Sequence, residues 1–266
     1  MKTEALVEFF KKGHGEARDL DALVLDYLDA LAVIEDDHIQ KSLLGELVDK
    51  YVTLEKRVDA LLKNTLPAEV ADTIKYEGRF VPRSYVCTIM FSDIAGFTSL
   101  AEKIPGDVLI GLLDRLFSGF DDVVGSRGGT KIKTIGDAYM AVFGAPLPGE
   151  DHAVKAVRTG LALLRHIESF NRENDQNLEM RIGIHTGKVM AGVVGKERMQ
   201  FDVFGDNVNI ASRFESSGRK GRLNVSHETY LMTKDSFLFE ARGEIALKHK
   251  GNMKAYFVLG EREVEG

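Results

Sequence analysis

From about residue 85 onward the sequence alternates apolar runs with amphipathic stretches, and this alternation constrains the fold more than any other feature. The run VCTIMFSDI (86–94) is typical of a buried strand that ends in a polar turn. Residues 106–124 and 151–170 carry apolar side chains at helical spacing. Strands and helices in this order predict an α/β (α+β) domain in which helices flank a mixed sheet.

Further elements follow from the same patterns. TKIKTI and AYMAVFG (130–144) flank Gly136 and Asp137, which predicts a hairpin with a Gly-Asp turn. The runs LEMRIGIHTG and KVMAGVVG are expected to form another strand pair. QFDVFG is expected to form a short strand, and a helix is expected to begin within DNVNIASRFESSG.

The first 65 or so residues have no strand-like alternation. Apolar residues there recur at alternating steps of three and four, which is a heptad seam: Leu44, Leu47, Tyr51, Leu54, Val58 and Leu61. We therefore expect a helical region over 1–65 with a parallel coiled coil at 44–61, a connector at 66–82 and the main domain at 83–266. The alternative is an amphipathic helix that packs on its own domain.

Composition excludes several classes of protein. The 266 residues carry a net charge of −6, which disfavours general binding of nucleic acid, and the single cysteine rules out an intrachain disulfide. No apolar run reaches the roughly 18 residues of a membrane span, and the N-terminus lacks the pattern of a signal peptide. We expect a cytoplasmic chain, although a fragment of a larger, membrane-tethered receptor stays open.

Two aspartates stand at strand ends. Asp93 follows an apolar strand and Asp137 lies in the Gly-Asp turn, so neighbouring strands would bring their carboxylates together. Magnesium prefers one or two carboxylates together with substrate phosphates. The alternative is that each aspartate only satisfies the backbone of its turn.

Phosphate-binding loops of the common types are absent from the sequence, which disfavours P-loop and Rossmann enzymes. A nucleotide would then be held by metal ions and single cations, for which Arg181, Arg213 and Lys250 are candidates. Asn209 and Arg213 are four residues apart in DNVNIASR and share one helix face. An amide that orients a sugar beside a guanidinium that binds a phosphoryl group is a plausible pair.

Five blocks together resemble, in order, the catalytic domain of class III nucleotidyl cyclases: FSDIAGFTSL, KIKTIGDAYMAVFG, MRIGIHTG, FDVFGDNVNIASRFESSG and LKHKGNMKAYFV. The resemblance covers about residues 80–260. It implies a ferredoxin-like core with a mixed, mostly antiparallel sheet, and a head-to-tail dimer with active sites at the subunit interface. The implied reaction is attack of the ribose 3′-oxygen on the α-phosphorus of a nucleoside triphosphate, which releases pyrophosphate.

The resemblance also implies residue roles. Asp93 and Asp137 are similar to the aspartates that bind two Mg²⁺ or Mn²⁺ ions, and the Ile94 carbonyl to the backbone ligand of the second ion. Asn209 is similar to the ribose-orienting amide, and Arg213 to the guanidinium that stabilises the pentacovalent phosphorus. Arg181 and Lys250 match positions that hold the β- and γ-phosphates.

Lys133 and Asp202 fall where such enzymes select the base. An aspartate accepts from the adenine amino group and a lysine donates to N1, whereas guanine reverses both preferences. Each buried mismatch costs about 1–3 kcal/mol, so these residues favour ATP over GTP. The chain is thus expected to be an adenylyl cyclase that makes 3′,5′-cyclic AMP.

The same resemblance implies a homodimer with two complete sites. Asp93, Asp137 and Arg181 would come from one subunit, and the other five side chains from its partner. A guanylyl or relaxed-specificity cyclase and a nucleotide-binding regulatory module without turnover are the alternatives. A polymerase or diguanylate cyclase on a related core is disfavoured, because TIGDAYM stands where a Gly-Gly-(Asp/Glu)-Glu-Phe hairpin is usual.

Overall fold

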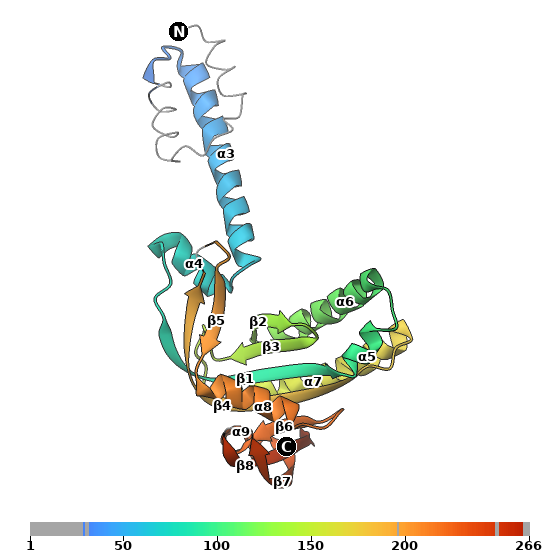
Figure 1. Cartoon of the computed structure of the whole chain (residues 1–266). Coiled ribbons are helices and arrows are strands. Elements are labelled where there is room, and N and C mark those ends of the chain that lie inside the picture. The colour runs from blue at the N-terminus through green and yellow to red at the C-terminus, as the bar shows by residue number, and fades with distance from the viewer. Residues whose placement is uncertain (1–28, 30–31, 196, 248–249, 263–266) are drawn as a thin grey trace. The chain divides into compact units, whose positions relative to one another are not determined.

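A computed structural model describes residues 29, 32–195, 197–247 and 250–262 (Figure 1). The helices within these ranges are α3 (Asp37–Lys63), α4 (Ala68–Glu77), α5 (Phe97–Ala101), α6 (Gly106–Gly125), α7 (His152–Asn174), α8 (Asp206–Ser216) and α9 (His227–Thr233). The strands are β1 (Arg83–Ala95), β2 (Thr130–Ile135), β3 (Ala138–Phe143), β4 (Glu179–Val194), β5 (Gln200–Phe204), β6 (Leu223–Ser226), β7 (Phe237–Leu247) and β8 (Gly251–Glu261).

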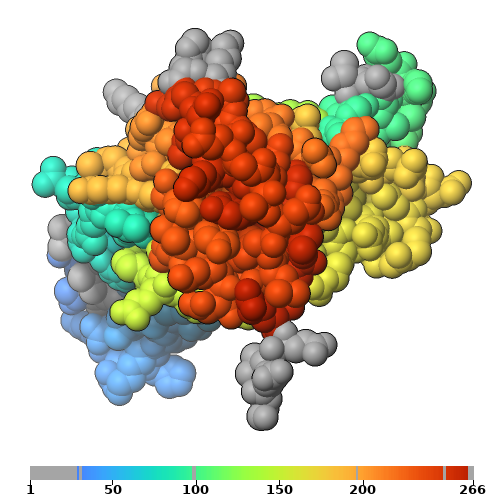
Figure 2. All heavy atoms as spheres, turned by 90° about the horizontal axis from the view of Figure 1, so that it is seen from below, coloured from blue at the N-terminus to red at the C-terminus, as the bar shows by residue number. Residues whose placement is uncertain are grey.

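Among the described residues these strands form one sheet in the order β2-β3-β1-β4-β6-β8-β7, and β5 pairs with β4 outside this path. Only the β4–β6 pair in that set is parallel. The predicted class, a mixed and mostly antiparallel sheet flanked by helices, is confirmed. The last two strands lie on the face shown in red and orange in Figure 2.

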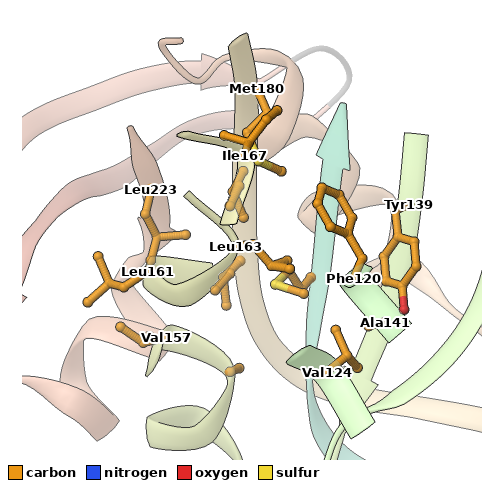
Figure 3. Packing of buried hydrophobic residues seen from close by; sticks show 14 of the residues in the cluster. Phe120, Val124, Tyr139, Ala141, Val157, Leu161, Leu163, Ile167, Met180 and Leu223 are labelled. Atoms are coloured by element: carbon orange, nitrogen blue, oxygen red, sulfur yellow. The ribbon is translucent and has the colours of Figure 1, made fainter. Parts of the chain in front are cut away.

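One face of the sheet is covered by α6 and α7, as Figure 3 shows. Apolar side chains repeat along both helices at steps of three and four and pack on alternate residues of the central strands. The largest buried contributors include Phe120 and Leu163 from the helices and Tyr139 and Met180 from the strands. This core holds β1, β3 and β4 in register and so fixes the strand ends that carry Asp93 and Arg181.

The opposite face of β4 is covered by α8. Ile182 and Ile184 point into the core, so Gly183 between them faces α8. A Cβ on Gly183 would lie 1.9 Å from the Glu215 backbone nitrogen, which only glycine avoids. A Cβ on Gly187 would likewise lie 2.4 Å from the Asn207 side chain. The glycines of β4 therefore mark the close approach of this helix.

One predicted element is wrong. LEMRIGIHTG and KVMAGVVG do not form a strand pair, because Glu179–Val194 is one continuous strand that pairs with β1 along 13 consecutive positions. Gly187, the last residue of the first run, lies within the strand opposite Cys87. Its small size admits Asn207 instead of allowing a turn.

The chain divides into two compact units, Met1–Leu62 and Lys63–Gly266. The expected coiled coil at 44–61 lies within α3, a helix of 27 residues with no buried side chain. The expected helical segment over residues 1–28 lies outside the described residues. The boundaries at 65 and 82 stay predictions, and α4 falls inside the expected connector. Among the described helices, none combines the length and apolarity that a bilayer crossing requires.

Candidate active site

The two strand-end aspartates are neighbours in the structure. Asp93 pairs in register with Ala138, the residue after Asp137, because β3 lies antiparallel to β1. Gly136 adopts φ 63°, a conformation that favours glycine and tightens the turn ahead of Asp137. The strand pairing thus brings together two carboxylates that are 44 residues apart in the sequence.

The electrostatics confirm how close these carboxylates lie. Burial raises the pKa of Asp137, and the charge of Asp93 together with a hydrogen bond to it raises that pKa further. Two neighbouring carboxylates favour a shared cation, which would offset their repulsion. Two carboxylates supply only part of a coordination shell, and the described residues include no cluster of three or more acidic, histidine or cysteine ligands. That donor set fits magnesium or manganese, which keep waters or substrate oxygens.

Arg181 faces the same pair of aspartates. It stands opposite Asp93 in the β1–β4 register, and its Nη2 donates to Asp93 Oδ2 at 2.5 Å. Its Nε donates to Glu215 Oε1 at 3.0 Å. Glu215 belongs to α8, so Arg181 connects this helix with the Asp93 carboxylate. We call Asp93, Asp137, Arg181 and Glu215 the carboxylate half-site.

Glu215 was not predicted from the sequence. Its side chain is 12% exposed, and burial raises its pKa to about 7 against the opposing charge of Arg181. The position follows Phe214 on the buried face of α8, where an acidic residue is unusual without a partner. That contrast with its apolar neighbours is the signal that could have identified it.

Ile94 follows Asp93 on β1, and its side chain is buried in the core. This orientation is the result of strand alternation, which sends Asp93 and Ile94 to opposite faces of the sheet. The Ile94 backbone remains next to the carboxylates, whereas its side chain contributes only to packing.

Lys133 and Asp202 form an ion pair, although 69 residues separate them. The β2–β3 pairing shifts register between Lys131 and Lys133, which is a bulge around the buried Ile132. Bulges redirect the side chains beside them. Asp202 is the more buried partner, at 10% side-chain exposure against 32% for Lys133. The predicted base-selecting residues are therefore in contact.

The remaining predicted residues lie on or beside α8. Lys250, in the β7–β8 turn, pairs with Asp206 in the first turn of that helix. Asn209 is exposed and Arg213 is half-buried. Within the described part of the chain neither side chain has a hydrogen bond to another residue. We call Asn209, Arg213 and Lys250 the α8 half-site.

The printed contacts thus sort the predicted residues into three groups. Glu215 and Arg213 are two residues apart on α8, so their side chains leave the helix in nearly opposite directions. Within one chain, Arg213 therefore points away from the carboxylates that Arg181 contacts.

Comparisons with known proteins identify the family to which the chain belongs. The family described as "Adenylate and Guanylate cyclase catalytic domain" matches residues 81–260. Receptor-type guanylate cyclase gcy-28 of Caenorhabditis elegans is 41% identical over 232 residues, which is 85% of this chain and 18% of that protein. An adenylate cyclase of Mycobacterium bovis is 38% identical over 208 residues, 77% of this chain and 47% of that protein. The chain therefore spans less than half the length of either relative.

Two solved structures match equally well in shape. The guanylate cyclase domain of RhGC from Catenaria anguillulae, in complex with GTP, has a TM-score of 0.66 at 34% identity and covers 68% of this chain and all of that one. The adenylyl cyclase CyaB from P. aeruginosa has a TM-score of 0.66 at 33% identity and covers 70% of this chain and all of that one.

The fold and the site define a nucleotidyl cyclase domain, and the chain belongs to the class III adenylate and guanylate cyclase family. Its similar proteins include both adenylyl and guanylyl cyclases. Membership alone thus leaves open which purine nucleotide is the substrate.

Proposed function

We propose that the chain is an adenylyl cyclase, which converts ATP to 3′,5′-cyclic AMP and pyrophosphate. The observation that carries the choice of base is the contact between Lys133 and Asp202. Their pairing in the free chain sets one donor and one acceptor side by side, as the adenine edge requires. Guanine would present a protonated N1 to the lysine and a carbonyl oxygen to the aspartate. Two such mismatches amount to roughly a hundredfold or more in selectivity.

The carboxylate half-site fits two Mg²⁺ or Mn²⁺ ions, held by Asp93, Asp137 and the Ile94 carbonyl. Divalent ions at such a site would activate the ribose 3′-hydroxyl and neutralise charge on the triphosphate. Support comes from the closeness of the two aspartates and from the raised pKa of Asp137.

The cationic and amide residues would position the substrate. Asn209 would orient the ribose, and Arg213 would stabilise charge on the α-phosphoryl oxygens. Arg181 and Lys250 would hold the β- and γ-phosphates. The lack of described hydrogen bonds at the side chains of Asn209 and Arg213 supports this assignment, because both side chains keep their full bonding capacity.

A complete site would combine the carboxylate half-site of one chain with the α8 half-site and the Lys133–Asp202 pair of a second copy. The opposite directions of Arg213 and Glu215 on α8 support this division. Apolar residues along α3 are a second support, since Tyr51 and Leu54 are 50% and 44% exposed. A parallel helix pair at 44–61 would bury them.

Replacement of Leu54 and Val58 by glutamine tests that helix pair. We expect a weaker dimer, which needs a higher protein concentration to stay associated, because two seam positions lose their apolar contacts. The basal rate per chain should also change. Analytical ultracentrifugation and rate measurements provide the readouts. Glutamine at Lys56 and Glu55, outside the seam, is the matched control. Unchanged sedimentation and rate in the seam variant would contradict the coiled coil.

The proposed reaction is tested by incubation of the chain with Mn²⁺ and either ATP or GTP, with the product identified by mass. We expect cyclic AMP, at a rate per chain that rises with protein concentration until the dimer is saturated. Cyclic GTP product as the main species would instead identify a guanylyl cyclase. No cyclic product from either nucleotide would favour a regulatory module.

A further inference from the structure

Glu215 has no role in the reaction as proposed so far, although it lies against the carboxylate half-site. Its side chain points back to Arg181 of its own chain, away from the direction that Arg213 takes from the same helix. An acidic side chain that is nearly buried beside two further carboxylates is electrostatically unfavourable without a specific partner. The guanidinium of Arg181 is that partner.

Arg181 makes two contacts with different consequences for substrate binding. Its Nη2 contact with Asp93 occupies a carboxylate that a divalent ion would need. Its Nε contact with Glu215 uses a nitrogen that is remote from Asp93. A guanidinium has five N–H donors in a fixed plane, so the Nε bond can persist while the terminal nitrogens exchange one acceptor for another.

The end of α8 that carries Glu215 is held rigidly. Gly183 allows the α8 backbone to lie directly on β4 at Glu215. Asn224 Nδ2 also donates to the Phe214 carbonyl at 2.6 Å, which holds the end of the helix. An acceptor on such a rigid support keeps its position when its donor changes other contacts.

We propose that Glu215 is a positioning residue that anchors Arg181 through Nε, so that the terminal nitrogens of the guanidinium transfer from Asp93 to a substrate phosphate when metal and nucleotide bind. This inference rests on the phosphate role proposed for Arg181. In the absence of the anchor, Arg181 can turn both terminal nitrogens to Asp93 and compete with the cation for that carboxylate. Loss of Glu215 should thus weaken both phosphate and metal binding.

The test uses the full chain and inorganic triphosphate in the presence of Mn²⁺, with affinity measured by titration calorimetry. Arg181→Ala and Glu215→Leu should each weaken triphosphate binding by about tenfold, as expected for a charged hydrogen bond. The double variant should bind no more weakly than Arg181→Ala alone, because Glu215 acts through that arginine. Glu215→Gln keeps an acceptor for Nε and should retain most of the affinity.

A matched control separates positioning from general loosening of α8. Phe214→Leu alters the neighbouring buried residue, whose ring stacks on His185 at 6.1 Å, without removing the acceptor. It should lower the thermal stability yet leave triphosphate affinity within twofold. Because these are binding measurements, they do not require turnover.

Three results would overturn the proposal. One is an additive loss in the double variant, and another is an equal loss with Phe214→Leu. The third is wild-type affinity in Glu215→Leu while Arg181→Ala binds weakly, which would leave the proposed function intact. An unchanged affinity in Arg181→Ala would contradict the phosphate role of that arginine, and the anchor with it.

Discussion

The two half-sites of the chain differ in how their charges are satisfied. In the carboxylate half-site, Asp93 and Asp137 crowd each other, and Arg181 bridges Asp93 to Glu215. In the α8 half-site, the side chains of Asn209 and Arg213 have no hydrogen bond to another described residue. Asp93 and Arg181 of the first region thus contact each other, whereas among the described residues of the second region only Lys250 is paired, with Asp206. A site shared between two chains, as proposed above, would account for this difference.

The comparison predicts the largest effect for the carboxylates. Asp93→Ala should lower turnover by about 10³-fold or more, because the metal loses a charged ligand and Arg181 loses a partner. Steady-state rates with Mn²⁺ and ATP provide the measurement, and Asp114→Ala on the exposed face of α6 is the matched control. Residual activity above a tenth of wild type would show that Asp93 is not essential to metal binding.

An intermediate effect is expected from Lys133 and Asp202, the pair that we propose selects the base. Lys133→Glu combined with Asp202→Cys should lower the ratio of kcat/KM for ATP over GTP by about a hundredfold, because both preferences of the pair are removed. Lys131→Glu, on the same strand, should leave that ratio unchanged. A double variant that keeps the wild-type ratio would remove the basis for an adenine preference.

The smallest effects concern stability. Ionised Asp137 destabilises the fold, since its pKa is raised by burial and by Asp93; the cost begins above the ordinary value of 3.8 and is complete above the raised value. Asp137→Asn should therefore stabilise the metal-free protein at pH 7 and lose the stabilisation by Mn²⁺. Arg213→Ala should change stability by less than about 0.5 kcal/mol.

Thermal unfolding in a chelator, followed by titration with Mn²⁺, measures these differences. The gain from Asp137→Asn should shrink as the pH approaches 4, where the wild-type carboxyl becomes protonated. If Asp137→Asn is instead less stable than wild type at pH 7, ionised Asp137 does not destabilise the fold.

Sequence patterns were sufficient for much of this architecture. Apolar periodicity predicted β1, α6 and α7, and the Gly-Asp turn predicted the hairpin that carries Asp137. The continuous β4 strand was missed, because a glycine inside a run reads as a break until the helix that packs on it is known. Gly183 and Gly187 are small to admit α8, and that contact is tertiary.

The closeness of Asp93 and Asp137 was predictable, because both aspartates lie at the ends of strands that pair. The bulge that turns Lys133 toward Asp202 depends on register, which no local pattern specifies. Glu215 was missed because a single acidic residue near a helix end is normally solvated. Its importance follows only from burial against Arg181, which is 34 residues earlier in the chain.

The account depends most on the claim that two chains complete one site, and a mixed dimer tests it directly. Asp93→Ala and Arg213→Ala chains carry different affinity tags, and doubly tagged dimers are purified and assayed with ATP and Mn²⁺. Each variant alone should be nearly inactive, whereas the mixed dimer should recover about half of the wild-type rate, since one of its two sites is intact. A mixed dimer as inactive as its parents would contradict the shared site.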